Sequence, residues 1–138
     1  MEAFSKALFL IPVQRATAAA TAKAFRNTVL AQFGAPAEVV TDNGSEFQAE
    51  FKEMLMEQGI KPRLSSPDHP QANGAAERLA KVFKISLQVY CCEEKVALSW
   101  DEKTPQIQLA YNITIHTSTK YSPYHVLCGR YSLSNTVK

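Results

Sequence analysis

The chain has 138 residues, which is the length of one domain and enough to bury a hydrophobic core without disulfides or a structural metal. Hydrophobic residues make up 46% and charged residues 20% of the sequence, and this globular composition excludes collagen-like and low-complexity chains. Fifteen Lys and Arg against thirteen Asp and Glu give a net charge of +2, which is too small to indicate nucleic-acid binding by bulk charge.

Cysteine usage and the start of the chain favour an intracellular protein. Cys91, Cys92 and Cys128 are an odd number, and the first two are adjacent, which disfavours a disulfide framework. The first apolar run does not fit a signal peptide, because Glu2 removes the basic leader and Arg15 follows the run without a cleavage pattern. No apolar run is long enough to predict a membrane span, so we expect no membrane partner.

A strand and a helix are predicted first. Residues 7–13 (ALFLIPV) form an apolar run that predicts a buried strand. Thr17 is a candidate N-cap for a helix that reaches about Phe33, where Gly34 and Pro36 favour a stop. The expected apolar stripe of this helix consists of Ala18, Ala22, Phe25, Val29 and Phe33.

Two further strands are predicted on either side of a second helix. Residues 38–41 (EVVT) predict a short buried strand, and residues 60–64 predict a third strand. Between them, Ser45 is a candidate N-cap for a helix that ends at Gly59. The expected apolar stripe of this helix consists of Phe47, Phe51, Met54 and Leu55.

The second half of the sequence predicts helices. Residues 65–72 (SSPDHPQA) contain two prolines and predict a loop, after which Asn73 can cap a long helix that reaches about Glu94. A capping box at residues 99–102 begins a last helix, and we expect the chain from Tyr121 to be mostly irregular. The alternation of strands and helices is typical of an α/β domain with a largely parallel sheet.

Asp42 is the first candidate site residue, because it stands at the carboxyl end of a predicted strand. Sites in open parallel sheets form beyond the carboxyl ends of strands. The Asn-Gly-Ser that follows predicts a tight turn into the next helix. An aspartate before Asn-Gly also begins an Asx-turn in many proteins, and on turn statistics alone this structural role is favoured.

Glu77, in the first turns of the predicted long helix, is the second candidate. Lys81, Lys84 and Gln88 share its helical face, whereas apolar residues occupy the other side. On helix grounds alone, a solvated face with an ordinary Glu77–Lys81 pair is favoured. Taken together, two carboxylates that share a divalent ion, beside two lysines that contact phosphates, would form a nucleic-acid site.

Other motifs carry less information. His69, in the loop before the long helix, is a candidate for substrate contact, although a turn histidine bonded to the backbone explains it equally well. The sequence contains no P-loop, dinucleotide fingerprint or nucleophile elbow. The common nucleotide-binding and serine-hydrolase classes are therefore disfavoured.

Three segments resemble the integrase core of retroviruses and gypsy-type LTR retrotransposons. They are VVTDNGSEF at residues 39–47, SSPDHPQANGAAER at residues 65–78, and WDEKTPQIQLAYNITIHTSTKYSPYHVLCGR at residues 100–130. Residues 4–22 resemble the strand and helix that precede the first of these motifs. Because the ordered combination is highly specific, we expect a partial integrase catalytic domain over residues 1–130 and an irregular tail over residues 131–138.

The resemblance implies an RNase H-like fold, with a mixed sheet flanked by helices, and a DDE-type polynucleotidyl transferase. In that family two Asp and one Glu bind two Mg²⁺ or Mn²⁺ ions, which activate a water or a 3′-hydroxyl for attack on a phosphodiester. Asp42 matches the second carboxylate and Glu77 matches the third. The implied partners are retroelement ends, target DNA and further copies of the chain, in the nucleus. The expected DNA-contacting residues are Lys81, Lys84, Arg78, Asn73 and His69.

The sequence departs from the family pattern in two places. The first catalytic aspartate of the family lies on a strand upstream of the segment aligned with Phe4, and that strand is missing here. Ala80 stands where many relatives have Asn after the Glu-Arg pair. We therefore expect a core fragment of a DNA-integrating enzyme. A non-catalytic, domesticated or decayed remnant that acts only in nucleic-acid or protein binding stays open as the alternative.

Overall fold

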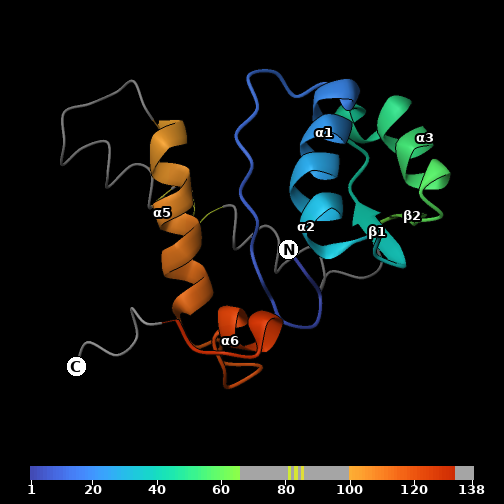
Figure 1. Cartoon of the computed structure of the whole chain (residues 1–138). Helices are drawn as coiled ribbons and strands as arrows, with labels where there is room; N and C mark the ends of the chain where they lie inside the picture. The colour runs from blue at the N-terminus through green and yellow to red at the C-terminus, as the bar shows by residue number, and fades with distance from the viewer. Residues whose placement is uncertain (66–80, 82, 84, 86–99, 133–138) are drawn as a thin grey trace. The chain divides into compact units, whose positions relative to one another are not determined.

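The computed structural model describes residues 1–65, 81, 83, 85 and 100–132 (Figure 1). The chain divides into two compact units. We call them the sheet unit (Ile11–Ala75) and the α5 unit (Met1–Leu10 together with Ala76–Lys138). Each unit has buried residues of its own, among them Phe51 and Leu55 in the first and Ala7 in the second.

The first helix of the sheet unit forms with its predicted cap. α1 (Ala18–Phe25) begins where the Thr17 side chain accepts a hydrogen bond from the Ala20 backbone N–H at 3.2 Å. The helix continues through a π-helical turn, η1 (Arg26–Leu30), into α2 (Ala31–Phe33), and it ends at the predicted glycine.

The π-helical turn was not predicted, and it changes which residues face the core. A π turn closes its hydrogen bonds over five residues instead of four, so the apolar spacing is interrupted between Phe25 and Phe33. Leu30 packs against the core, whereas Phe33, which the predicted stripe placed on the buried face, is 48% exposed.

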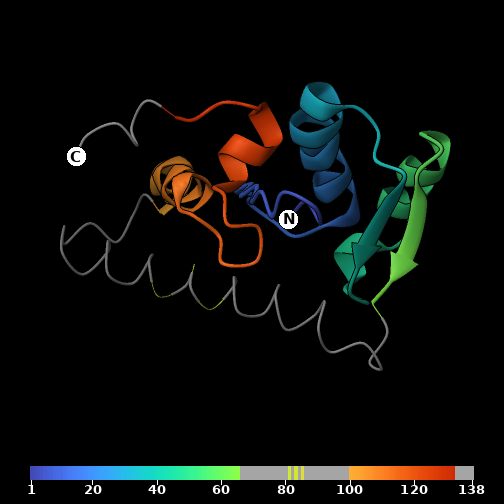
Figure 2. The ribbon, with the colours of Figure 1, turned by 90° about the horizontal axis from the view of Figure 1, so that it is seen from below.

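A parallel two-stranded sheet confirms two of the predicted strands. β1 (Glu38–Thr41) pairs with β2 (Lys61–Leu64), and Figure 2 shows them side by side and pointing the same way. In the register, Glu38 lies opposite Lys61. The prediction that β1 is buried was wrong, because exposed and half-buried residues alternate along it and Val40 is 52% exposed.

The helix predicted from Ser45 is split into two pieces. η2 (Ser45–Phe47) is a 3-10 turn, and α3 (Glu50–Glu57) follows Ala49, whose φ of 43° breaks the helical backbone. The buried stripe of α3 is confirmed, because its apolar residues recur at steps of three and four. The buried core of the sheet unit consists of Ala22, Phe51, Met54, Leu55 and Ile60.

The strand predicted over residues 7–13 was wrong, since the described part of the chain forms no strand there. The backbone of this segment bonds instead to side chains of α5 (Trp100–Ile113). The Leu10 N–H donates to Gln108 Oε1 at 2.7 Å, and Leu8 forms two hydrogen bonds with the Asn112 amide. Side-chain amides therefore satisfy backbone groups that a neighbouring strand would otherwise pair.

The described residues after Tyr121 contain more regular structure than predicted. The segment after Tyr121, which we expected to be irregular, contains α6 (Pro123–Cys128). The helix predicted over residues 73–94 and the loop before it lie outside the described residues, apart from Ser65 and three helical residues of the long helix. Those three residues are Lys81, Phe83 and Ile85.

Candidate functional site

Asp42 lies where the sequence placed it, directly after β1 at the carboxyl end of the strand. Its carboxylate is exposed, and Oδ1 accepts a hydrogen bond from the Gly44 N–H at 3.0 Å. This bond is an Asx-turn, so the structural role that turn statistics favoured is confirmed. The turn uses one oxygen in a single hydrogen bond, and it fixes the carboxylate at the end of the strand without burying it.

The turn that follows Asp42 is held by its own side chains. The Gln48 side-chain amide donates to Asn43 Oδ1 at 3.2 Å and so closes the loop from the far end. Gly44 has φ of −62°, which any residue adopts, so its role is to give room. A Cβ at position 44 would lie 2.7 Å from Oε2 of Glu46, and that side chain would have to move. Glu46 thus lies near the same turn as Asp42.

Most of the other predicted site residues lie outside the described part of the chain. Lys81 is described, has a helical backbone and is exposed, as we expect for the predicted lysine stripe of Lys81 and Lys84. The structure does not describe Glu77, Lys84, Arg78, Asn73 and His69. The pairing of Asp42 with Glu77 therefore stays a prediction.

Asp42 by itself fits the chemistry of a hard divalent cation. An exposed carboxylate oxygen is a preferred ligand of Mg²⁺. Within the described ranges, no group of three or more His, Cys, Asp or Glu side chains comes together as a metal site. Among the described residues, Asp42 therefore belongs to no such cluster.

Glu2 is bound to its own turn and does not offer a free carboxylate. Its two oxygens accept hydrogen bonds from the Phe4 N–H at 2.8 Å and from the Ser5 N–H at 2.6 Å. The Ser5 hydroxyl donates to Oε2 as well. Burial raises the pKa of Glu2, but these hydrogen bonds and the charge of Lys6 outweigh it, so the pKa lies below its ordinary value. Glu2 is a structural acceptor within the α5 unit.

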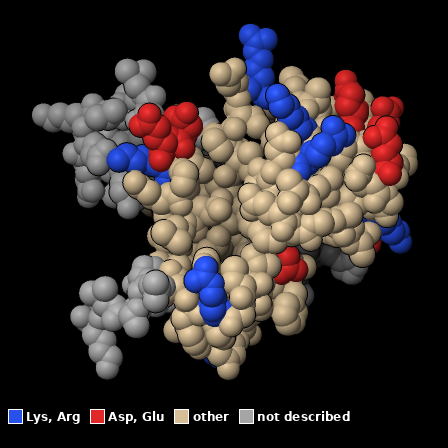
Figure 3. All heavy atoms as spheres, in the orientation of Figure 1, with Lys and Arg blue, Asp and Glu red and all other residues tan. Residues whose placement is uncertain are grey.

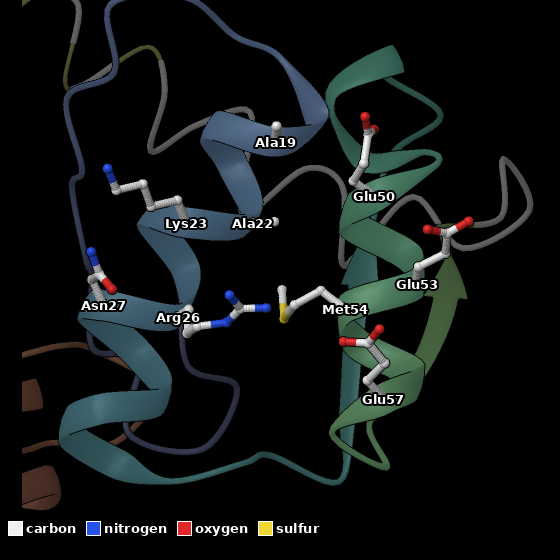
Figure 4. Close-up of a pocket in the computed structure, with 9 residues that line it drawn as sticks. All are labelled: Ala19, Ala22, Lys23, Arg26, Asn27, Glu50, Glu53, Met54 and Glu57. Atoms are coloured by element: carbon white, nitrogen blue, oxygen red, sulfur yellow. The ribbon is translucent and has the colours of Figure 1, made fainter.

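A groove of about 550 Å³ between the first helix and α3 was not predicted (Figure 4). Arg26 points across the groove toward Met54, and Glu57 points back from α3. Opposed charges on the two walls suit neither a polyanion nor a metal ion, so we assign this groove no part in catalysis. The available signal was the spacing of charged residues, which is three on the first helix (Lys23 and Arg26) and three and four on α3 (Glu50, Glu53 and Glu57). The charged and amide side chains that line the groove are Lys23, Arg26, Asn27, Glu50, Glu53 and Glu57.

The sequence matches a known protein family and known transposon proteins. Residues 1–70 match the integrase core domain family. The chain is 30% identical over 134 residues to the Tf2-3 and Tf2-4 transposon polyproteins of Schizosaccharomyces pombe. This match covers 96% of the chain and 10% of each polyprotein, so the chain spans about a tenth of the length of these relatives.

Solved structures show the same fold. The integrase catalytic core domain of HTLV-2, solved in complex with magnesium in a trimeric form, matches with a TM-score of 0.71 at 22% identity, over 89% of this chain and 78% of that one. A simian T-cell lymphotropic virus intasome in complex with the PP2A regulatory subunit B56 gamma contains a chain that matches with a TM-score of 0.75 at 21% identity, over 88% of this chain and 44% of that one. The chain therefore has the fold of integrase catalytic cores. In the described residues, no helix is long and apolar enough to cross a membrane.

Proposed function

The chain belongs to the integrase core domain family, and on that basis we propose that it is part of a retroelement integrase that cuts and joins DNA strands. The position of Asp42 carries this proposal. It is an exposed carboxylate in the TDNGSEF motif, at the carboxyl end of β1, where open α/β sheets place their sites.

Asp42 and Glu77 would together hold Mg²⁺ or Mn²⁺, with two ions in the complete site. A bound divalent ion stabilises charge on the oxygens of a phosphodiester during displacement. The protein supplies the hard oxygen ligands, and the Asx-turn at Gly44 keeps the Asp42 carboxylate oriented. The magnesium bound by the HTLV-2 core supports this choice of ion by analogy.

The DNA would lie along the helix that carries Glu77. The exposure of Lys81 supports this, because a lysine that contacts phosphate must reach the surface. The other proposed contacts are those of Lys84, Arg78, Asn73 and His69. Retroelement ends and target DNA are the proposed partners, in a nuclear homo-oligomer. The trimeric form of the HTLV-2 core supports self-association by analogy.

The 138 residues alone would not cut DNA. They supply two of the three carboxylate positions that the family resemblance implies. Glu2 does not replace the third, because its carboxylate is already bound in its own turn. The proposed core therefore needs a further carboxylate and its strand from sequence outside these residues.

A strand-transfer assay with Mn²⁺ tests the proposed function. The chain alone is compared with the chain extended by its own upstream coding sequence, each with Asp42→Asn, Glu77→Gln and the matched control Glu57→Gln. We expect activity in the extended chain, loss of it in the first two variants and retention in the control. Activity that survives Asp42→Asn would contradict the proposal. An inactive extended chain that still binds DNA would establish the non-catalytic alternative.

A further inference from the structure

An aromatic cluster surrounds α6, and the proposed metal site does not use it. Tyr121 and Tyr131 both stack on the His125 ring, with centroids 5.5 Å and 3.9 Å away and interplanar angles of 29° and 14°. The Arg130 guanidinium lies 5.5 Å from the centroid of the Tyr124 ring. We call this surface the α6 face, and it consists of Lys120, Tyr121, Tyr124, His125, Arg130 and Tyr131.

The local sequence fixes this arrangement. The Ser122 side chain caps α6 by accepting a hydrogen bond from the His125 N–H at 3.3 Å, and a proline occupies the first helical position. Gly129 ends the helix with φ of 69°, a left-handed conformation that reverses the chain. That reversal brings Tyr131 back onto His125. The rings are therefore held in place before any ligand binds.

The stacked rings stay open to solvent. Tyr121 is 50% exposed and Tyr131 is 60% exposed, although both contact His125. Rings that served only as core would be covered, since burial of their apolar surface is what stabilises a core. Lys120 and Arg130, which flank these two tyrosines in the sequence, are exposed as well.

The charge distribution along the chain also favours an anionic ligand at the α6 face. All thirteen acidic residues lie at or before Glu102, and the remaining 138 − 102 = 36 residues contain none. Figure 3 shows lysine or arginine atoms over α6, whereas acidic atoms lie at the start of α5. The cations of the acid-free stretch are Lys103, Lys120, Arg130 and Lys138.

We propose that the α6 face binds single-stranded nucleic acid. Open aromatic faces stack on unpaired bases, and neighbouring cations hold the phosphates of the same strand. Tyr131 is the stacking platform, and Lys120 and Arg130 are the phosphate contacts. In a duplex the bases are already stacked on one another, so the α6 face favours a single strand. This proposal uses none of the carboxylates proposed to bind metal and does not depend on them.

The test is a fluorescence-anisotropy titration of a labelled oligothymidylate with the 138-residue chain in EDTA. Tyr131→Ala should weaken binding about 5- to 150-fold, and Tyr131→Trp should retain it, because any aromatic face stacks. Arg130→Ala should lower the slope of log K against log salt by about 0.7. Phe4→Ala is the matched control, because Phe4 is 79% exposed in the same unit.

Each outcome decides the proposal. If Tyr131→Ala binds as tightly as Phe4→Ala, the stacking platform does not exist. If Tyr131→Trp loses as much affinity as Tyr131→Ala, the loss reflects packing around His125 and the proposal is overturned. Asp42→Asn should bind the single strand normally in EDTA, so failure of the metal site and failure of the α6 face are distinguishable.

Discussion

Asn112 binds the backbone of Leu8 through both ends of its side-chain amide. Oδ1 accepts from the Leu8 N–H at 2.8 Å, and Nδ2 donates to the Leu8 carbonyl at 2.8 Å, across 104 positions of sequence. Asn112 is only 9% exposed. The pair reproduces the two hydrogen bonds of an antiparallel strand neighbour, and it ties the start of the chain to α5.

Replacement of Asn112 by Ala should therefore destabilise the chain by about 2 kcal/mol, because two backbone groups lose their partners in a partly buried place. Urea unfolding measures the loss. Gln106→Ala, at an exposed position of the same helix, is the control and should cost little. Equal losses in the two variants would show that the amide does not hold the segment.

Tyr111→Phe should leave the free energy of unfolding unchanged at neutral pH or raise it by up to about 1 kcal/mol. The Tyr111 hydroxyl oxygen is buried and has no hydrogen-bond partner among the described residues, so its removal ends a desolvation cost. Thermal unfolding beside Tyr121→Phe, whose ring is half exposed, measures the difference. A clear destabilisation by Tyr111→Phe would mean that the hydroxyl has a partner.

The same tyrosine predicts a loss of stability in alkali. Burial raises the pKa of Tyr111 above its ordinary value, so the folded state favours the neutral phenol. Its contribution is fully present below the unfolded pKa of about 10 and is lost as pH rises through the higher folded pKa. Unfolding free energies measured above pH 10 should fall less steeply for Tyr111→Phe than for the wild-type chain. Identical pH profiles would contradict this cause.

Replacement of Lys81 and Lys84 together by Ala should weaken duplex binding on every DNA sequence and lower the salt slope by about two units. Each phosphate contact releases counterions and carries no base information. A salt titration of the double variant measures this. Lys52→Ala with Lys61→Ala, two exposed lysines of the sheet unit, is the matched control. Equal salt slopes for the two double variants would show that the lysine stripe is only solvated surface.

Local signals were sufficient for much of the sheet unit. Thr17 caps its helix and Phe51 is buried because capping and helical spacing are set within a few residues. The exposure of Phe33 could not be predicted, because the π-helical turn before it has no clear mark in the sequence. The strand expected over residues 7–13 failed for a different reason. An apolar run specifies extended backbone, but its hydrogen-bond partner is set by tertiary structure, which here supplies Asn112.

The features of the candidate site and of the α6 face could also be predicted only in part. The Asx-turn at Asp42 follows from the Asp-Asn-Gly sequence, and the structure confirms it. The helix at α6 was missed although Ser122 and Pro123 are ordinary start signals, because the short run after them has little helical periodicity. The stacking of Tyr131 on His125 depends on the chain reversal at Gly129, which spacing alone does not reveal.

The most direct test of the metal site is an anomalous-scattering map from crystals of the chain grown with Mn²⁺. We predict a single Mn²⁺ within coordination distance of both the Asp42 and the Glu77 carboxylates, because a pair of ions needs the third carboxylate of the complete site. Glu57→Gln crystals serve as the control and should show the same density. Mn²⁺ bound to only one of the two carboxylates, or the two carboxylates on opposite faces of the sheet, would contradict the account.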